Sequence, residues 1–141
     1  MSPEGYCLYL IHYTPLAERR AHLERELQAA GLERLQPRWI LEHDREAFAE
    51  EDLQGLIVRG GGLGQIGGPL NAGHVSVILK HLEAFKAAAE SEAPWHLVLE
   101  DDVVLDRAFL PKLERMLRNL PADWEIVVVG DGCRLQIPWW R

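Results

Sequence analysis

An apolar run that leads directly into three acids decides the fold: WHLVLEDD, residues 95–102. Its aromatic and aliphatic side chains are typical of a strand buried on both faces, as in a parallel sheet covered by helices. Helical patterns lie on either side of it, over residues 71–85 and 107–119. The stretch therefore predicts a strand between two helices, with carboxylates at its carboxyl end.

Three further strand candidates continue this alternation. The run at 6–11 is apolar throughout, the run at 36–41 is weaker, and the run at 125–129 follows the second helical segment. Strands that alternate with helices in this way predict an α/β domain with a mainly parallel sheet.

The expected helices carry end signals. Thr14 is a suitable cap and Pro15 is tolerated at a first helical position, so we expect a helix from there to Gly31. Asn71 is a good cap for the next helix. The apolar residues that recur on one side of that helix, and that we expect it to bury, are Val75, Ile78, Leu79, Leu82 and Phe85.

Length and composition limit the function. With 141 residues, 48% of them apolar and 26% charged, the chain is expected to form one globular domain over 1–141. Fifteen basic against 22 acidic residues give a net charge of −7, which opposes unaided binding to nucleic acid. Cys7 and Cys133 lack the spacing of a metal site, and no apolar run reaches the ~18 residues of a membrane span. Because the N-terminus also lacks a signal-peptide pattern, we expect a cytoplasmic protein.

Polar clusters follow three of the expected strands, at 12–14, 43–45 and 100–102. The carboxyl ends of parallel strands are where open α/β sheets bind ligands. Adjacent carboxylates repel one another, and a Mg²⁺ or Mn²⁺ ion would neutralise them. The alternative is a solvated loop in which Asp101 or Asp102 caps a turn.

A glycine-rich segment at 59–73 matches the dinucleotide fingerprint G-x-G-x-x-G over residues 62–67. The strand candidate before it is short, and Gly68-Pro69 follows where a helix should run. We therefore interpret the segment as a loop that closes over a ligand. The alternative, the dinucleotide-binding motif of an NAD-dependent oxidoreductase, fits less well.

The order of the motifs resembles glycosyltransferase family 25, the lipopolysaccharide biosynthesis group that also includes collagen galactosyltransferases. The likeness lies in Leu10-Ile11-His12-Tyr13 followed by Arg19-Arg20, in Leu79-Lys80-His81-Leu82, in Leu99-Glu100-Asp101-Asp102-Val103, and in Leu120-Pro121-Ala122-Asp123-Trp124. The chain departs from the family at His12-Tyr13, where an Asn-Leu pair is usual, and at Lys80, where Ser is usual. Members are generally longer, so the chain looks truncated at its C-terminal side.

The resemblance implies a Rossmann-like, three-layer GT-A fold and transfer of a sugar, galactose from UDP, to a lipopolysaccharide or other glycan. Asp102, with Glu100 or Asp101, would hold Mn²⁺ or Mg²⁺ against the diphosphate; we assign the metal to Glu100 and Asp102. The residues assigned to the nucleotide sugar are Tyr13, Arg19, Asp44, Lys80, His81 and Asp101.

Three matters stay open at this level. The catalytic base is not identified, and Asp131 is only a candidate. Arg19 and Arg20 have a second interpretation as the solvated side of a helix. The alternative function is a non-catalytic, truncated domain that binds nucleotide or a partner, and apolar surface left by a missing part would favour a homodimer.

Overall fold

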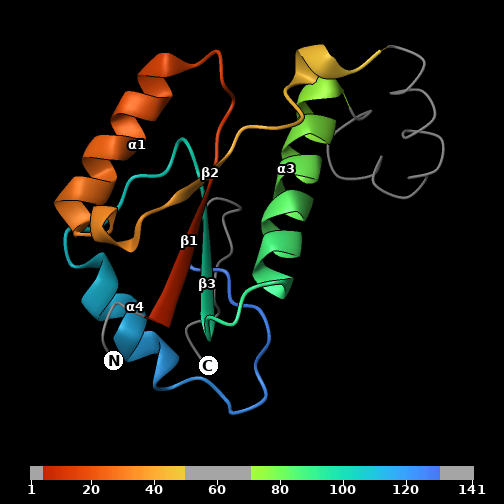
Figure 1. Cartoon of the computed structure of the whole chain (residues 1–141). Coiled ribbons are helices and arrows are strands. Elements are labelled where there is room, and N and C mark those ends of the chain that lie inside the picture. Colours follow the sequence, from red (N-terminus) through yellow and green to blue (C-terminus); the bar gives the residue numbers. More distant parts are fainter. Residues whose placement is uncertain (1–4, 50–70, 131–141) are drawn as a thin grey trace, which may run out of the picture. The chain divides into compact units, whose positions relative to one another are not determined.

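The computed structural model describes residues 5–49 and 71–130. The chain divides into two compact units; in sequence, the first ends at Arg107 and the second begins at Ala108. The elements of the first unit are β1 (Tyr6–Ile11), α1 (Ala17–Ala30), η2 (Glu33–Leu35), β2 (Arg38–Ile40), η3 (Arg45–Ala47), α3 (Ala72–Ala89) and β3 (Trp95–Glu100) (Figure 1). The second unit contains α4 (Phe109–Leu117).

The three strands form one sheet in the order β2-β1-β3, and both pairings are parallel. In register, Ile11 at the end of β1 lies opposite Ile40 of β2 and Glu100 of β3. All three strands therefore end at the same edge. The prediction of an α/β fold with a parallel sheet is confirmed.

Helices cover the two faces of this sheet, with α1 on one side and α3 on the other (Figure 1). Successive side chains of a strand point to opposite faces, so β1 contributes to both layers. The buried cluster that includes α3 consists of Tyr9, Ile11, Ile40, Ala84 and Ala87. In the first unit the arrangement is Rossmann-like.

The start of α1 differs from the prediction, and its end agrees. The helix begins at Ala17, and no side chain caps the position before it. Thr14 does not act as the cap: it lies in a turn, and its backbone N–H donates to Oδ1 of Asp44 at 3.4 Å. At the other end Gly31 has φ +70°, the left-handed conformation of a helix stop.

Helix α3 begins where predicted, but of the five apolar residues expected to be buried only Val75 is fully buried. The Asn71 side chain accepts from the backbone N–H of His74, as a capping residue should. Ile78, Leu82 and Phe85, which were expected to be buried, are exposed. The residues that α3 buries are Val75, Ser76, Lys80, Ala84 and Ala87. The buried side of α3 therefore combines small alanines, which let the helix approach the sheet closely, with polar side chains that have hydrogen-bond partners in the polypeptide. The larger apolar side chains lie on the other side of the helix.

The expected strand at 125–129 is absent from the structure described. Residues 125–129 adopt no regular structure, and Ile126 is 82% exposed. A strand needs a neighbour that takes its backbone hydrogen bonds, and apolar sequence alone does not supply one. The predicted helix over 107–119 is present as α4, with Leu110 and Leu113 buried.

Several predictions fall outside the described residues, namely those for residues 59–70 of the glycine-rich segment, Asp131, Cys133 and the end of the chain. The single-domain and homodimer predictions stay predictions. In the described residues, no helix combines the length and the apolar character that a bilayer crossing requires.

Candidate functional site

The sheet brings the three polar clusters to its carboxyl edge. His12 and Tyr13 follow β1, Asp101 follows β3, and Asp44 lies beyond β2. A hydrogen bond of 2.8 Å joins His12 Nδ1 to Asp101 Oδ2, and the Thr14 N–H reaches Asp44. The structure thus unites residues up to 89 positions apart, as the parallel sheet predicts.

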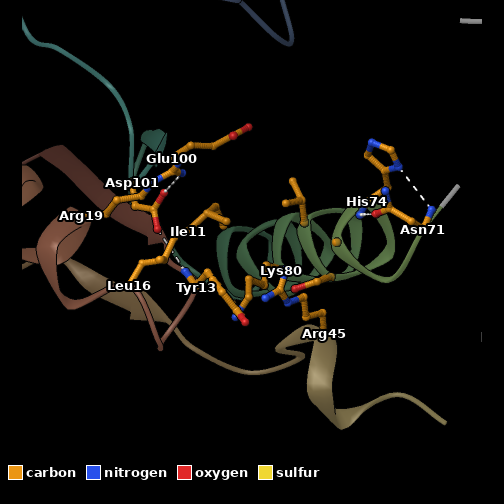
Figure 2. Close-up of a pocket in the computed structure, with 13 residues that line it drawn as sticks. Ile11, Tyr13, Leu16, Arg19, Arg45, Asn71, His74, Lys80, Glu100 and Asp101 are labelled. Carbon is orange, nitrogen blue, oxygen red and sulfur yellow. Dashed lines mark hydrogen bonds and ion pairs between the residues drawn. The ribbon is translucent and has the colours of Figure 1, made fainter. Parts of the chain in front are cut away.

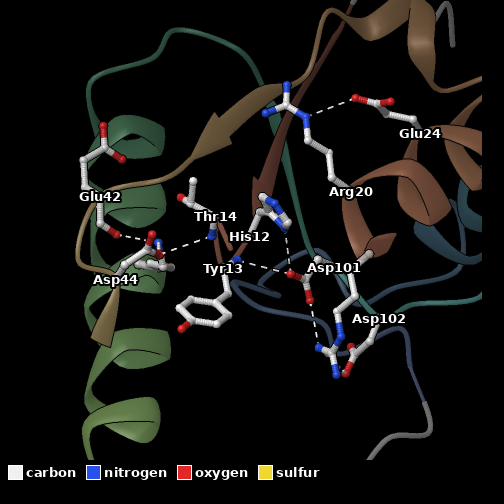
Figure 3. Close-up of polar contacts among 11 residues, drawn as sticks. His12, Tyr13, Thr14, Arg20, Glu24, Glu42, Asp44, Asp101 and Asp102 are labelled. Carbon is white, nitrogen blue, oxygen red and sulfur yellow. Dashed lines mark hydrogen bonds and ion pairs between the residues drawn. The ribbon is translucent and has the colours of Figure 1, made fainter. Parts of the chain in front are cut away.

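Asp101 is the buried centre of the first group of contacts (Figure 3). Its Oδ2 also accepts the Tyr13 backbone N–H at 3.1 Å, and its Oδ1 accepts Nη1 of Arg19 at 3.0 Å. Burial raises the pKa of the Asp101 carboxyl, but the bonds from Tyr13, His12 and Arg19 outweigh it, so the pKa lies below its ordinary value. The side chain is therefore an ionised, fully engaged carboxylate.

The flanking acids differ from Asp101 because they are accessible. The side chain of Asp102 is 59% exposed, and one oxygen lies 3.5 Å from Arg19 Nη1. Glu100 is 50% exposed and its Oε1 lies 3.6 Å from Nε2 of His81. Hard cations such as Mg²⁺ bind one or two carboxylates and complete their shell with water and phosphate oxygens, and these two acids can supply such oxygens. Over 5–49 and 71–130 no three His, Cys, Asp or Glu residues gather as a metal site.

Asp44 is the centre of a second group of contacts. Its Oδ1 lies 2.9 Å from Nζ of Lys80, a side chain that is only 1% exposed. The same ammonium donates to the Glu42 carbonyl at 2.6 Å. Burial raises the pKa of Asp44, whereas the bonds from Lys80 and Thr14 lower it, and the net result is a pKa below the ordinary value.

The Tyr13 ring lies between these two groups. The Arg45 guanidinium stacks over the ring at 4.8 Å from its centre. The Tyr13 hydroxyl and Arg45 Nε both donate to Oε1 of Glu46. The Glu46 bond raises the pKa of the Tyr13 phenol, which keeps the phenol protonated at neutral pH. The Arg45 guanidinium is thus held over the Tyr13 ring.

A pocket of about 330 Å³ opens at this edge of the sheet. Figure 2 shows Arg19 and Asp101 at one end, and Asn71 and His74 of the α3 start at the other. The lining residues are Ile11, Tyr13, Leu16, Arg19, Arg45, Asn71, Gly73, His74, Ser76, Val77, Lys80, Glu100 and Asp101. Basic, acidic and aromatic groups around an apolar floor suit a charged organic ligand.

Most of the residues expected to bind the ligand line this pocket, and three do not. Tyr13, Arg19, Lys80, Glu100 and Asp101 are all in its wall. The expected residues outside the wall are Asp44, His81 and Asp102. The binding roles of all eight residues, inside and outside the wall, stay predictions.

The sequence analysis placed Arg45 in the polar cluster at 43–45 but assigned no binding role to it or to the first turn of α3. Arg45 directly follows Asp44, so its place beside an expected site residue was a usable signal. Asn71 had been noted only as a helix cap. The chain runs down α3 away from the carboxyl edge of the sheet and returns to that edge along β3. The first turn of α3, with its cap Asn71, therefore lies at the carboxyl edge, beside the ligand region.

The two neighbouring arginines have separate roles. Arg20 points toward Glu24, with 3.2 Å from Nε to Oε1 (Figure 3). Its guanidinium lies over the Trp39 ring, 4.6 Å from the ring centre. Arg19 contacts Asp101 and Asp102. The interpretation as a solvated helix side therefore fits Arg20 better than Arg19.

Comparison with known proteins gives two curated relatives, both named procollagen galactosyltransferase 2. The human protein is 32% identical over 72 residues and the mouse protein 31%, each match covering 49% of this chain. The chain spans 11% of the length of these relatives. No family model and no solved structure matches. Both names support a relation to glycosyltransferases, and neither mentions lipopolysaccharide.

Proposed function

We propose that this chain carries the nucleotide-sugar site of a glycosyltransferase. One observation carries the proposal: the pocket at the carboxyl edge of the parallel sheet collects Tyr13, Arg19, Glu100 and Asp101 from segments far apart in the sequence. The partial likeness to two galactosyltransferases supports the same reaction class. We infer a UDP-sugar, with galactose as the sugar, as the donor.

The pocket's groups divide between the parts of such a donor. The Tyr13 ring and the Arg45 guanidinium offer a flat surface for the base or ribose. Arg19, partly exposed beside Asp101, offers a positive charge for a phosphate. Glu100 and Asp102 would hold a Mn²⁺ or Mg²⁺ ion, which would stabilise the departing diphosphate when bound.

Transfer forms a bond from an acceptor hydroxyl oxygen to the anomeric carbon while the bond from that carbon to the diphosphate breaks. The hydroxyl proton passes to a base. Asp131 stays the candidate for this base and lies outside the described residues. We propose a glycan acceptor, lipopolysaccharide in the first instance, and a cytoplasmic site of reaction.

The donor half of this proposal is tested without the acceptor. Calorimetric titration of UDP into the chain is carried out with Mn²⁺, with a chelator, and with the Asp102→Ala variant. We expect binding that requires the metal and weakens at least about tenfold in the variant. A control, Glu24→Ala, removes an exposed acid of α1 that does not line the pocket, and this variant should bind as the wild type does.

Binding that is equal with metal and with chelator would remove the metal from the proposal. The absence of UDP binding in every sample would overturn the nucleotide-sugar site. The non-catalytic interaction domain would then be the better interpretation.

A further inference from the structure

One side of α3 holds the segment between β2 and η3 through three side chains. Ser76 Oγ donates to the His43 carbonyl at 2.6 Å, and Lys80 Nζ donates to the Glu42 carbonyl at 2.6 Å. Glu83 Oε1 lies 3.4 Å from His43 Nε2. These helix residues are spaced four and three apart, so they share one side of the helix. Together they fix residues 42 and 43 against α3.

Lys80 is the buried member of this group. With 1% of its side chain exposed and two oxygen partners within 2.9 Å, its ammonium has little surface left for a ligand. A charge in such a place is tolerated only when it is paired and hydrogen-bonded. Although Lys80 lies in the pocket wall, its charged end is directed at protein atoms.

Through its partner Asp44, Lys80 is connected to both residues of the stacked pair, Tyr13 and Arg45. Asp44 directly precedes η3, whose first residue, Arg45, lines the pocket and stacks on Tyr13. The same Asp44 oxygen that meets Lys80 also accepts the Thr14 N–H, next to Tyr13. Asp44, which Lys80 holds, is therefore bonded next to Tyr13 and directly precedes Arg45. It adds to the Asp101 bond at the Tyr13 N–H and to the Glu46 carboxylate that both side chains share.

We propose that Lys80 is a positioning residue, which holds Asp44 so that Tyr13 and Arg45 stay stacked in the pocket, and that it makes no contact with the donor. This inference rests on the proposed function and deepens it. It also changes the role first expected for Lys80 and Asp44, because both now act through the Tyr13–Arg45 pair.

The first test needs no ligand. Nuclear Overhauser effects between the Arg45 δ-methylene and the Tyr13 ring protons report the stacking in solution. We expect them in the wild type and in Lys86→Met, where the lysine is exposed on the same helix. In Lys80→Met and in Asp44→Asn they should weaken, because only the bonds to Glu46 then hold the two side chains together, and Lys80→Arg should restore part of them. Asp44→Asn keeps the side-chain size, so it carries the test if Lys80→Met does not fold.

The second test measures UDP affinity in a double-mutant cycle. Lys80→Met and Asp44→Asn should each weaken UDP binding about tenfold or more, because a displaced binding group costs up to about a hundredfold. The double variant should bind no worse than either single variant, since both changes break one link. Lys86→Met should bind like the wild type.

The outcomes separate the two proposals. Losses that add in the double variant, or stacking in Lys80→Met as strong as in the wild type, would overturn the positioning role. If the wild type does not bind UDP, the proposed function fails and the donor-related part of this inference fails with it. The stacking measurement then still decides whether Lys80 organises the pocket.

Discussion

Asp101 and Asp44 are two carboxylates at one edge of the sheet, held in different ways. Asp101 follows β3 and takes its partners from the end of β1 and from Arg19 of α1. Asp44 lies in the irregular segment after β2 and takes its cation from α3. The register of two parallel strands sets the first group of contacts. The rotation of α3 about its axis sets the second group of contacts. Substitutions in the two groups should therefore reduce stability by different amounts.

The largest effect is expected where strand register places the charge. Asp101→Asn removes the charge that pairs with Arg19 and disturbs a buried acceptor of three bonds. We expect a loss of about 2–3 kcal/mol in the free energy of unfolding, at the low end for a broken buried pair because Arg19 is half exposed. Urea titration at pH 7 measures it.

The exposed neighbour provides the matched control for this change. Asp102→Asn should alter stability by no more than about 0.5 kcal/mol. Equal losses in the two variants would show that burial does not distinguish these acids.

The second group should be weaker, because Asp44 is 22% exposed and water can replace part of what it loses. Lys80→Met leaves Asp44 and the Glu42 carbonyl without their cation, and we expect a loss of about 2 kcal/mol. Lys86→Met, the exposed control, should cost less than about 0.5 kcal/mol. A variant of Lys80 as stable as the wild type would show that α3 is not held by this contact.

The pH dependence of stability compares the two groups directly. The pKa values of Asp101 and Asp44 both lie below the ordinary 3.8, so the folded chain binds fewer protons than the unfolded chain in acid. Their contribution is therefore complete above about pH 4 and is lost as the pH falls through the folded pKa values.

Urea midpoints between pH 6 and pH 2 measure this loss. We expect Asp101→Asn and Asp44→Asn each to make the decline shallower. Glu46 and Glu83, whose pKa values are also lowered, should leave some decline in both variants. A decline as steep as in the wild type would exclude that aspartate as its source.

The smallest effect is expected on the outer side of α3. Leu82 is 46% exposed, so Leu82→Gln should change the free energy of unfolding by no more than about 0.5 kcal/mol. Ala84→Gln places the same side chain on the buried side, where it should cost well over 1 kcal/mol. Thermal unfolding of the two variants measures this, and a large loss in Leu82→Gln would show that the apolar side is covered.

The strand ends could be predicted because buried strands are recognisable as short apolar runs in the sequence. Residues 95–99 and 6–11 were predicted as strands; β1 has the predicted bounds, and β3 extends one residue further, to Glu100. Parallel pairing then required Asp101 to lie near His12. The weaker run at 36–41 formed only the three residues of β2, and 125–129 formed no strand, because partners decide whether a run is used.

The buried side of α3 could not be predicted from apolar spacing. Ile78, Leu82 and Phe85 form the regular pattern, yet the helix buries Ser76 and Lys80. A polar side chain is buried when acceptors from elsewhere in the fold meet it, here the carbonyls of residues 42 and 43. The sequence of α3 itself contains no information on where those carbonyls lie. The same reason explains why no binding role was predicted for Arg45.

The sequence by itself determined the parallel α/β sheet and the placing of the acids at its carboxyl edge, because apolar runs and their ends are local properties. Only the tertiary structure decided which acid is engaged and which is accessible, and that Lys80 is directed at Asp44. Those outcomes depend on the distance between groups far apart in the chain, and on the requirement that every buried charge has a partner.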